Sequence, residues 1–280
     1  MSQELIIRVS VFLAVFASLA CLESFQPRRQ AELKRTERWP GAGVLFVSGA
    51  VLGRLAVPTG LAGLALWAEG QGIGLFNLIV LPAWMVGVFA FLILDLSVWG
   101  QHLAMHKVPF LWRMHRVHHS DPHIDVVTAL RFHPAEILVS LGWKAAVVVA
   151  FGIPAWAAFL FEVALNAFAQ FNHANWALPK RVDTVLRQLV VTPDMHRVHH
   201  STDHMESNRN FGFCLSIWDR LFRLYKAQPD AGHADMEIGQ KDWRTARDQA
   251  PIDLLVQPLK RPKDQYSAGL SSSASGSQSD

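Results

Sequence analysis

Long apolar runs, rather than a regular alternation of apolar and polar positions, dominate the first two thirds of the chain. A helix that crosses a bilayer needs about 20 apolar residues. Residues 5–22, 43–66, 76–99 and 137–171 reach or approach that length. The last run is too long for one straight helix and has Gly152-Ile153-Pro154 at its middle, which predicts a helical hairpin. The pattern therefore predicts an all-α protein with about four membrane segments, the last of them a hairpin.

Charges and prolines modify two of these segments. Arg8 lies near the start of the first, from where its long side chain can reach the membrane surface. A cleavable signal peptide is the alternative, but Glu4 and the lack of a basic residue before Arg8 disfavour it. The second run contains Arg54 and Pro58, so we expect a kinked helix that packs against its neighbours.

The composition and the distribution of charge agree with a membrane protein. Hydrophobic residues make up 51% of the 280 positions and charged residues only 18%, whereas soluble domains usually carry about 25% charged residues. Lysine and arginine gather between the apolar runs, and the positive-inside rule then places residues 26–40, 101–135 and 173–280 in the cytoplasm and the N-terminus outside. Because the basic residues follow the membrane topology, we expect no nucleic-acid partner.

This pattern divides the chain into three parts. We expect N-terminal transmembrane segments in residues 1–100. A histidine-rich region follows in residues 101–262, which includes the membrane hairpin and a cytosolic helical cap. Residues 263–280 are rich in Ser and Gly and are expected to be disordered. Cys21 and Cys214 form no metal-binding motif and no disulfide framework.

The histidines carry the strongest chemical signal in the sequence. All thirteen follow residue 101, and most fall into three clusters with helical spacing. Residues three and four apart share one face of a helix, so each cluster can aim two or three imidazoles at one point. The heptapeptide of residues 114–120 recurs unchanged at residues 195–201. The three clusters are His102 and His106; His115, His118 and His119; and His196, His199 and His200.

Eight or more neutral imidazoles that point inward require a cation to bind their lone pairs. Imidazole suits zinc, copper, iron and nickel, and two metal ions with four or five ligands each would use about this many side chains. No cysteine lies within the clusters, which disfavours Cu(I) and iron–sulfur sites. The clusters lie close to the ends of apolar runs, where a substrate dissolved in the membrane can approach.

Isolated polar residues extend this set. His173 directly follows the hairpin and is favoured as a ligand, whereas for His133 a ligand role and a hydrogen-bonding role are both open. Asp95 lies two helical turns before His102, so it either accepts the second N–H of a ligand imidazole or pairs with Arg116 or another loop arginine. Hydrogen-bonded structural roles are the simpler interpretation for His123, His204 and His233.

In these motifs the chain resembles the sterol desaturase and fatty acid hydroxylase superfamily of membrane di-iron enzymes. The resemblance covers roughly residues 80–260. It rests on the order of short motifs along the chain: Asp95 before His102-x3-His106, and then residues 111–120, 128–136, 172–176, 192–200, 210–212 and 217–222.

The resemblance implies two iron ions, O2 and electrons from a separate donor, a ferredoxin or a cytochrome with its reductase. It implies a lipid substrate (a sterol, a fatty acyl chain, a carotenoid or an ether lipid) that is hydroxylated or desaturated. Zinc could replace iron in purified protein because it ranks above Fe²⁺ in affinity. Supporting roles around the ligands are implied for Asp95, Asn210 and Asp219. The implied metal ligands are His102, His106, His115, His118, His119, His173, His196, His199 and His200, with His133 as a further candidate.

Two other classes of function remain as alternatives. In a zinc hydrolase the same imidazoles would activate water, but such sites commonly need a nearby carboxylate as general base, and none of the clusters contains one. A metal transporter would place its polar groups near the middle of the membrane, whereas these histidines lie beyond the apolar runs.

Overall fold

Helices form the regular structure of residues 3–261, the part of the chain that the computed structural model describes. In this part there is no β-strand, only three isolated β-bridges. The prediction of an all-α fold is therefore confirmed. The segment 263–280, for which we expect disorder, lies outside the described residues.

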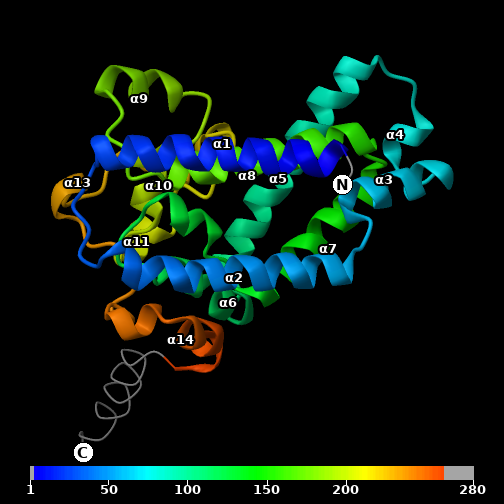
Figure 1. Cartoon of the computed structure of the whole chain (residues 1–280). Coiled ribbons are helices and arrows are strands. Elements are labelled where there is room, and N and C mark those ends of the chain that lie inside the picture. Colours follow the sequence, from blue (N-terminus) through cyan, green and yellow to red (C-terminus); the bar gives the residue numbers. More distant parts are fainter. Residues whose placement is uncertain (1–2, 262–280) are drawn as a thin grey trace, which may run out of the picture.

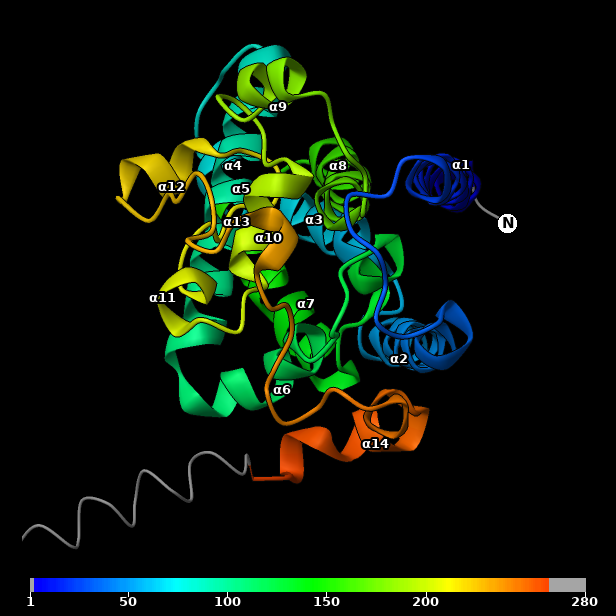
Figure 2. The same ribbon diagram turned by 90° about the vertical axis from the view of Figure 1, so that its left-hand side faces the viewer.

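The apolar runs form long helices, of which α1, α2 and α8 lie roughly parallel in Figure 1 and are seen nearly end-on in Figure 2. Four stretches are long and apolar enough to cross a membrane: Gln3–Phe25, Arg35–Leu78, Ala83–Lys107 and Pro134–Phe151. The helices of this part are α1 (Gln3–Phe25), α2 (Arg35–Ala56), α3 (Gly60–Gly70), α4 (Leu75–Leu78), α5 (Ala83–Lys107), α7 (Pro134–Phe151) and α8 (Ala155–His173).

The predicted hairpin, α7 and α8, lies at the centre of this bundle. Helix α1 packs on α8, α2 packs on α7, and α3 and α5 contact both. The break falls where the sequence places it: α7 ends at Phe151, and Gly152 has φ 62°, a left-handed conformation that favours glycine. Pro154 precedes the first residue of α8. The hairpin is therefore the element onto which the other long helices pack. Of its two helices, α7 is among the four candidate spans and α8 is not.

Two membrane segments differ from their predicted bounds. The second is not one kinked helix but two, because α2 ends at Ala56 and α3 begins at Gly60. Pro58 accounts for the gap, since it has no N–H to continue the helix and it forces the residue before it out of helical geometry. The third was expected to end at residue 99, but α5 continues to Lys107 because no helix breaker intervenes. This extension carries the first two clustered histidines.

Short helices and loops form a cap at one end of the bundle. Figure 1 shows α9, α10, α11 and α13 together near the end where α1 finishes and α2 starts. The elements of this part are α6 (Pro109–His119), η1 (Val126–Leu130), α9 (Lys180–Leu186), α10 (Pro193–His199), α11 (His204–Ser207), α12 (Ile217–Leu221), α13 (Gly232–Asp235), η2 (Ala246–Gln249), α14 (Pro251–Val256) and η3 (Gln257–Leu259).

A buried arginine joins the cap to the membrane bundle. Arg38, in the first turns of α2, is 1% exposed. Its guanidinium donates to both oxygens of Asp121 at 2.6 and 2.7 Å and to Asp125 at 2.8 Å. Burial alone would raise the pKa of Asp121, but Arg38 and Arg131 lower it to about 2. One side chain of α2 therefore pairs with two carboxylates in the loop between α6 and η1.

We expect Arg38→Leu to lower the free energy of unfolding by about 3–5 kcal/mol, because both carboxylates would stay buried without their cation. Thermal unfolding in detergent measures this loss. Arg181→Leu is the matched control, since Arg181 is exposed on α9 and its loss should change stability little. Equal stability of the two variants would contradict the role of Arg38.

Candidate metal centre

Nine histidines gather in two adjacent groups between α5, α6, α8 and α10. Within each group, the potential ligand nitrogens all lie within 4.8 Å of one another. All nine residues are buried except His106, which is partly exposed. The first group is His102, His106, His115, His119 and His199, and the second group is His118, His173, His196 and His200.

Each triple cluster is divided between the two groups. On α6, His115 and His119 join the first group and His118 joins the second. Residues at i and i+4 lie about 40° apart around a helix, whereas i+3 and i+4 lie about 100° apart. The repeat at residues 196–200 on α10 is divided in the opposite sense. The expectation that one cluster serves one point is therefore corrected: α6 and α10 each contribute to both groups.

Four of the imidazoles are held by hydrogen bonds from Nδ1 to an oxygen. A carbonyl or carboxylate oxygen can only accept, so the proton of each ring lies on Nδ1 and the lone pair lies on Nε2. The pairs are His102 with the Phe211 carbonyl at 2.7 Å, His115 with Glu136 at 2.6 Å, His173 with the Ala169 carbonyl at 2.6 Å, and His199 with the Arg209 carbonyl at 2.8 Å.

These tautomers leave lone pairs facing one another. The Nε2 atom of His102 lies 3.1 Å from Nε2 of His115 and 3.0 Å from Nε2 of His199. With all three protons on Nδ1, no hydrogen bond can join these nitrogens, and their lone pairs repel. A cation between them removes the repulsion, so the donor set of the first group fits a metal ion that prefers imidazole.

The second group has the same convergent arrangement. Nε2 of His173 lies 3.0 Å from Nε2 of both His118 and His196. Within the described part of the chain, the buried Nδ1 atoms of His118, His196 and His200 have no hydrogen-bond partner. The residues of this group therefore also fit a metal ion.

Burial keeps these imidazoles neutral. It lowers the pKa of His118, His119, His196 and His200 well below the usual value of 6.5, and neighbouring imidazoles lower it further. For His199 burial and His115 lower the pKa to about 3. The lone pairs are therefore available to a metal at neutral pH.

Asn210 and Asp219 support the ligands through the backbone. Asp219 accepts from the N–H groups of Phe211 and Gly212 at 2.8 and 2.9 Å, and the carbonyl of Phe211 receives the proton of His102. Asn210 has φ 55° and donates to the carbonyl of Met195 at 2.9 Å. Both side chains thus fix the loop whose carbonyls orient two of the imidazoles.

Asp95 has different partners from those expected. It accepts from the N–H groups of Cys214 and Leu215 at 3.3 and 3.1 Å and from Nε1 of Trp218 at 2.8 Å. Among the described residues it hydrogen-bonds neither an imidazole nor Arg116. Its carboxylate therefore connects α5 with the loop before α12 and does not hold a candidate ligand directly.

The remaining histidines lie outside both groups. His133 precedes α7, where its Nδ1 accepts from the N–H of Ala135 and its Nε2 donates to the carbonyl of Leu255, both at 3.1 Å. Both ring nitrogens of His133 are thus used in hydrogen bonds that hold α7 and the C-terminal helices. His204 is exposed, and the other two are buried in the cap: His123 and His233.

Glu136 is a site residue that the sequence analysis did not single out. It is 4% exposed, one oxygen accepts from Nδ1 of His115, and the other has no hydrogen-bond partner among the described residues. Its position in the first turn of α7 looks like an ordinary helix-capping charge, and only the fold brings it to His115. It contacts the ring on the edge away from Nε2, as a group that orients a ligand does.

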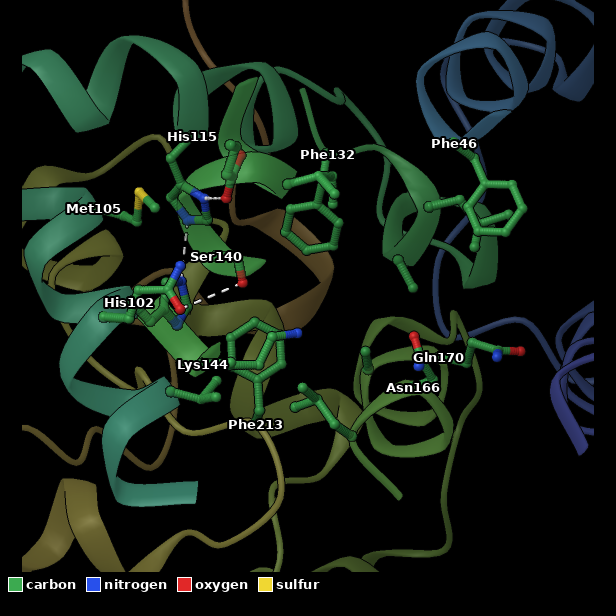
Figure 3. A pocket seen from close by; sticks show the side chains of 18 of the residues that line it. Phe46, His102, Met105, His115, Phe132, Ser140, Lys144, Asn166, Gln170 and Phe213 are labelled. Carbon is green, nitrogen blue, oxygen red and sulfur yellow. Dashed lines mark hydrogen bonds and ion pairs between the residues drawn. The ribbon is translucent and has the colours of Figure 1, made fainter. Parts of the chain in front are cut away.

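A cavity reaches the first group from the membrane bundle (Figure 3). It has a volume of about 170 Å³. Met105, Phe132 and Phe213 line it beside His102 and His115. An apolar chain in this cavity would lie against two of the candidate ligands. Polar side chains line the cavity as well: Gln101, Ser140, Lys144, Asn166 and Gln170.

Comparison with known proteins identifies relatives of this region. Residues 87–223 match the family described as fatty acid hydroxylase. The chain is 30% identical over 175 residues to the ornithine lipid hydroxylase OlsE of Rhizobium tropici, which covers 62% of this chain and 50% of that protein. It is 31% identical over 143 residues to the alkylglycerol monooxygenase of Danio rerio and 30% identical over 141 residues to that of Homo sapiens. These two alignments each cover 50% of this chain and 30% of the relative. The chain thus spans half or less of the length of these relatives, and no solved structure matches it.

The neutral histidines make the stability of the metal-free protein depend on pH. In the unfolded chain the imidazoles take up protons near pH 6.5, whereas in the folded chain the pKa of His199 is about 3. As the pH falls below 6.5, the unfolded state binds more protons. The free energy of unfolding then decreases by about 1.4 kcal/mol per pH unit for each such group.

We therefore expect the thermal unfolding midpoint of metal-free protein in detergent to fall clearly between about pH 7.5 and about pH 5.5. His204→Gln, which changes an exposed histidine, should leave this dependence unchanged. A midpoint that is the same at both pH values would show that the imidazoles accept protons in place.

Proposed function

Because the chain belongs to the sterol desaturase and fatty acid hydroxylase superfamily through residues 87–223, we propose that it is a membrane-bound di-iron oxygenase of lipids. The observation that carries the proposal is the pair of histidine groups with facing Nε2 lone pairs beside an apolar cavity. Two of the relatives are named as a lipid hydroxylase and a monooxygenase, so hydroxylation is the first outcome to test and desaturation the second.

The nine histidines of the two groups would hold the two irons, one ion in each group. Bound iron would supply the oxidation of an unactivated C–H bond by O2, which no side chain of this protein can perform. Zinc could occupy the same imidazoles in purified protein because it ranks above Fe²⁺ in affinity. His133 is not proposed as a ligand, since both of its ring nitrogens have other partners.

The protein itself would position the substrate and exclude water. Phe132 stacks on His118 with ring centroids 4.4 Å apart, and both Phe132 and Phe213 line the cavity. These aromatic side chains would hold an apolar chain beside His102 and His115 and keep bulk water away from the reacting carbon.

Electrons would come from a separate ferredoxin or cytochrome with its reductase. Such donors reach the site from the aqueous side, and the positive-inside rule places the cap in the cytosol and the N-terminus outside. We propose this orientation for the whole chain, with the lipid arriving from the membrane and the electrons from the cytosol.

We expect His118→Ala and His199→Ala to abolish lipid oxidation and to lower the iron content, because each removes a ligand from a different group. The measurements are metal content per chain, about two irons in the wild type, and O2-dependent formation of oxidised lipid by mass spectrometry. His204→Ala is the matched control on an exposed histidine. Full activity in either ligand variant would contradict the assignment. Zinc that cannot be exchanged for iron, with no O2 uptake, would favour the hydrolase instead.

We expect Glu136→Gln to lower iron affinity or activity about 10–100-fold, because the carboxylate that orients His115 is replaced by a neutral amide. Iron content under chelator competition and oxidation rate at full loading separate the two effects. Glu69→Gln, at an exposed position of α3, is the control. Unchanged affinity and rate would mean that His115 does not depend on this contact.

A further inference from the structure

We propose, on the basis of the proposed function, that the substrate is a lipid with an anionic headgroup, a phosphate or a carboxylate. Its headgroup would bind at Arg8 and Lys144 within the membrane bundle and at Arg54, which is exposed near the end of α2, and its apolar chain would run from there to the imidazoles.

The site is a second compartment that joins the cavity beside the first histidine group. It lies between α1, α2, α3, α7 and α8 and has a volume of about 670 Å³, against about 170 Å³ for the cavity beside the imidazoles. Lys144, Ser140, Asn166 and Ile137 line both. The wider compartment can take a headgroup, while the narrower one suits a single chain.

Charged side chains give the wider compartment its selectivity. Arg8, Arg54 and Lys144 line it together with Glu4 and Glu162, which leaves an excess of one positive charge (three cations and two carboxylates). Charges within a membrane bundle are costly unless they are paired or serve a ligand. Arg54 and Glu4 are exposed, but the partly buried side chains of Arg8, Lys144 and Glu162 keep the same excess of one positive charge, which favours an anionic ligand.

Only part of this charge is neutralised within the protein. Arg8 pairs with Glu162 at 2.8 Å and lies over the ring of Phe159 at 4.7 Å. Among the described residues Lys144 and Arg54 form no hydrogen bond or salt bridge, and Glu162, which already pairs with Arg8, is the acidic group that attracts the ammonium of Lys144. Their cationic groups are therefore free to donate to the oxygens of a headgroup. Figure 3 shows Lys144 beside Phe213 in the cavity next to the imidazoles, and Lys144 lines the wider compartment as well.

The position of Lys144 determines which part of the lipid reaches the metals. Lys144 lies two helical turns from Glu136 on α7, about 12 Å along the helix axis, and Glu136 holds His115. A lipid anchored at Lys144 would therefore present a carbon within its chain, several bonds from the headgroup. The oxidised carbon should not be the one bonded to the headgroup.

The test uses lipids with identical acyl chains: phosphatidic acid, the free fatty acid and neutral diacylglycerol. With the iron-loaded full chain, we expect Lys144→Met to raise KM for an anionic lipid about tenfold or more, the effect of losing one charge-assisted hydrogen bond. KM for diacylglycerol and the iron content should not change. Lys144→Arg should restore binding, and Lys107→Met, which removes a lysine from the surface contact with Asn208, is the matched control.

A second measurement does not depend on activity. We expect phosphatidic acid or the fatty acid to raise the thermal unfolding midpoint of the wild type more than diacylglycerol does, and this difference to disappear in Lys144→Met. Whichever of these two anionic lipids raises the midpoint more shows whether the site prefers a phosphate or a carboxylate headgroup. Equal stabilisation by diacylglycerol would overturn the headgroup site. So would a Lys144→Met variant that still distinguishes anionic lipids from diacylglycerol. Neither result would contradict the proposed oxygenase activity. Stabilisation that depends on Lys144, without oxidation of any lipid, would instead overturn the oxygenase.

Discussion

The mutual repulsion of imidazole lone pairs is the constraint on which the rest of this structure depends. The Nε2 atoms of His115 and His199 lie 3.1 and 3.0 Å from Nε2 of His102, and a cation between these nitrogens relieves the repulsion of their lone pairs. Hydrogen bonds from Nδ1 fix the rings in this orientation, so the protein needs an acceptor behind each of them. The backbone of residues 209–211 and the carboxylate of Glu136 provide these acceptors.

The continuity of α5 connects this site with the membrane. One uninterrupted helix, Ala83–Lys107, begins as an apolar span and ends with two members of the first histidine group. The two histidine groups therefore lie where the bundle meets the cap, next to a cavity lined by side chains from the spans. Arg38 reinforces the same junction from α2, since it joins that helix to the loop after α6. The histidine groups and the membrane bundle are thus built on the same helices.

The local sequence was sufficient for the features that depend on spacing. Apolar runs predicted the spans, and Gly152 and Pro154 predicted the hairpin. The histidine spacing predicted that the clustered imidazoles gather, but not how they divide between the two groups. Features that depend on residues far apart in the chain could not be predicted from the sequence. Glu136 resembles a capping residue until the fold brings it to His115, and the acceptors of two imidazoles are backbone carbonyls, which carry no residue signature. The partners of Asp95 lie about 120 positions along the chain, so spacing alone could not identify them.

Because α6 and α10 each contribute histidines to both groups, the order of synthesis along the chain matters for the site. The first histidine group takes four of its five members from residues 102–119, yet the fifth is His199, and the second group lacks half of its members until residues 196–200 exist. At about 5–20 residues per second, the ribosome needs about 4–16 s to pass from residue 119 to residue 199. During that interval the earlier helices enter the bilayer with neither centre complete. Both histidine groups are therefore complete only after translation of both repeats, and a chain truncated before residue 196 would lack one member of the first group and two members of the second.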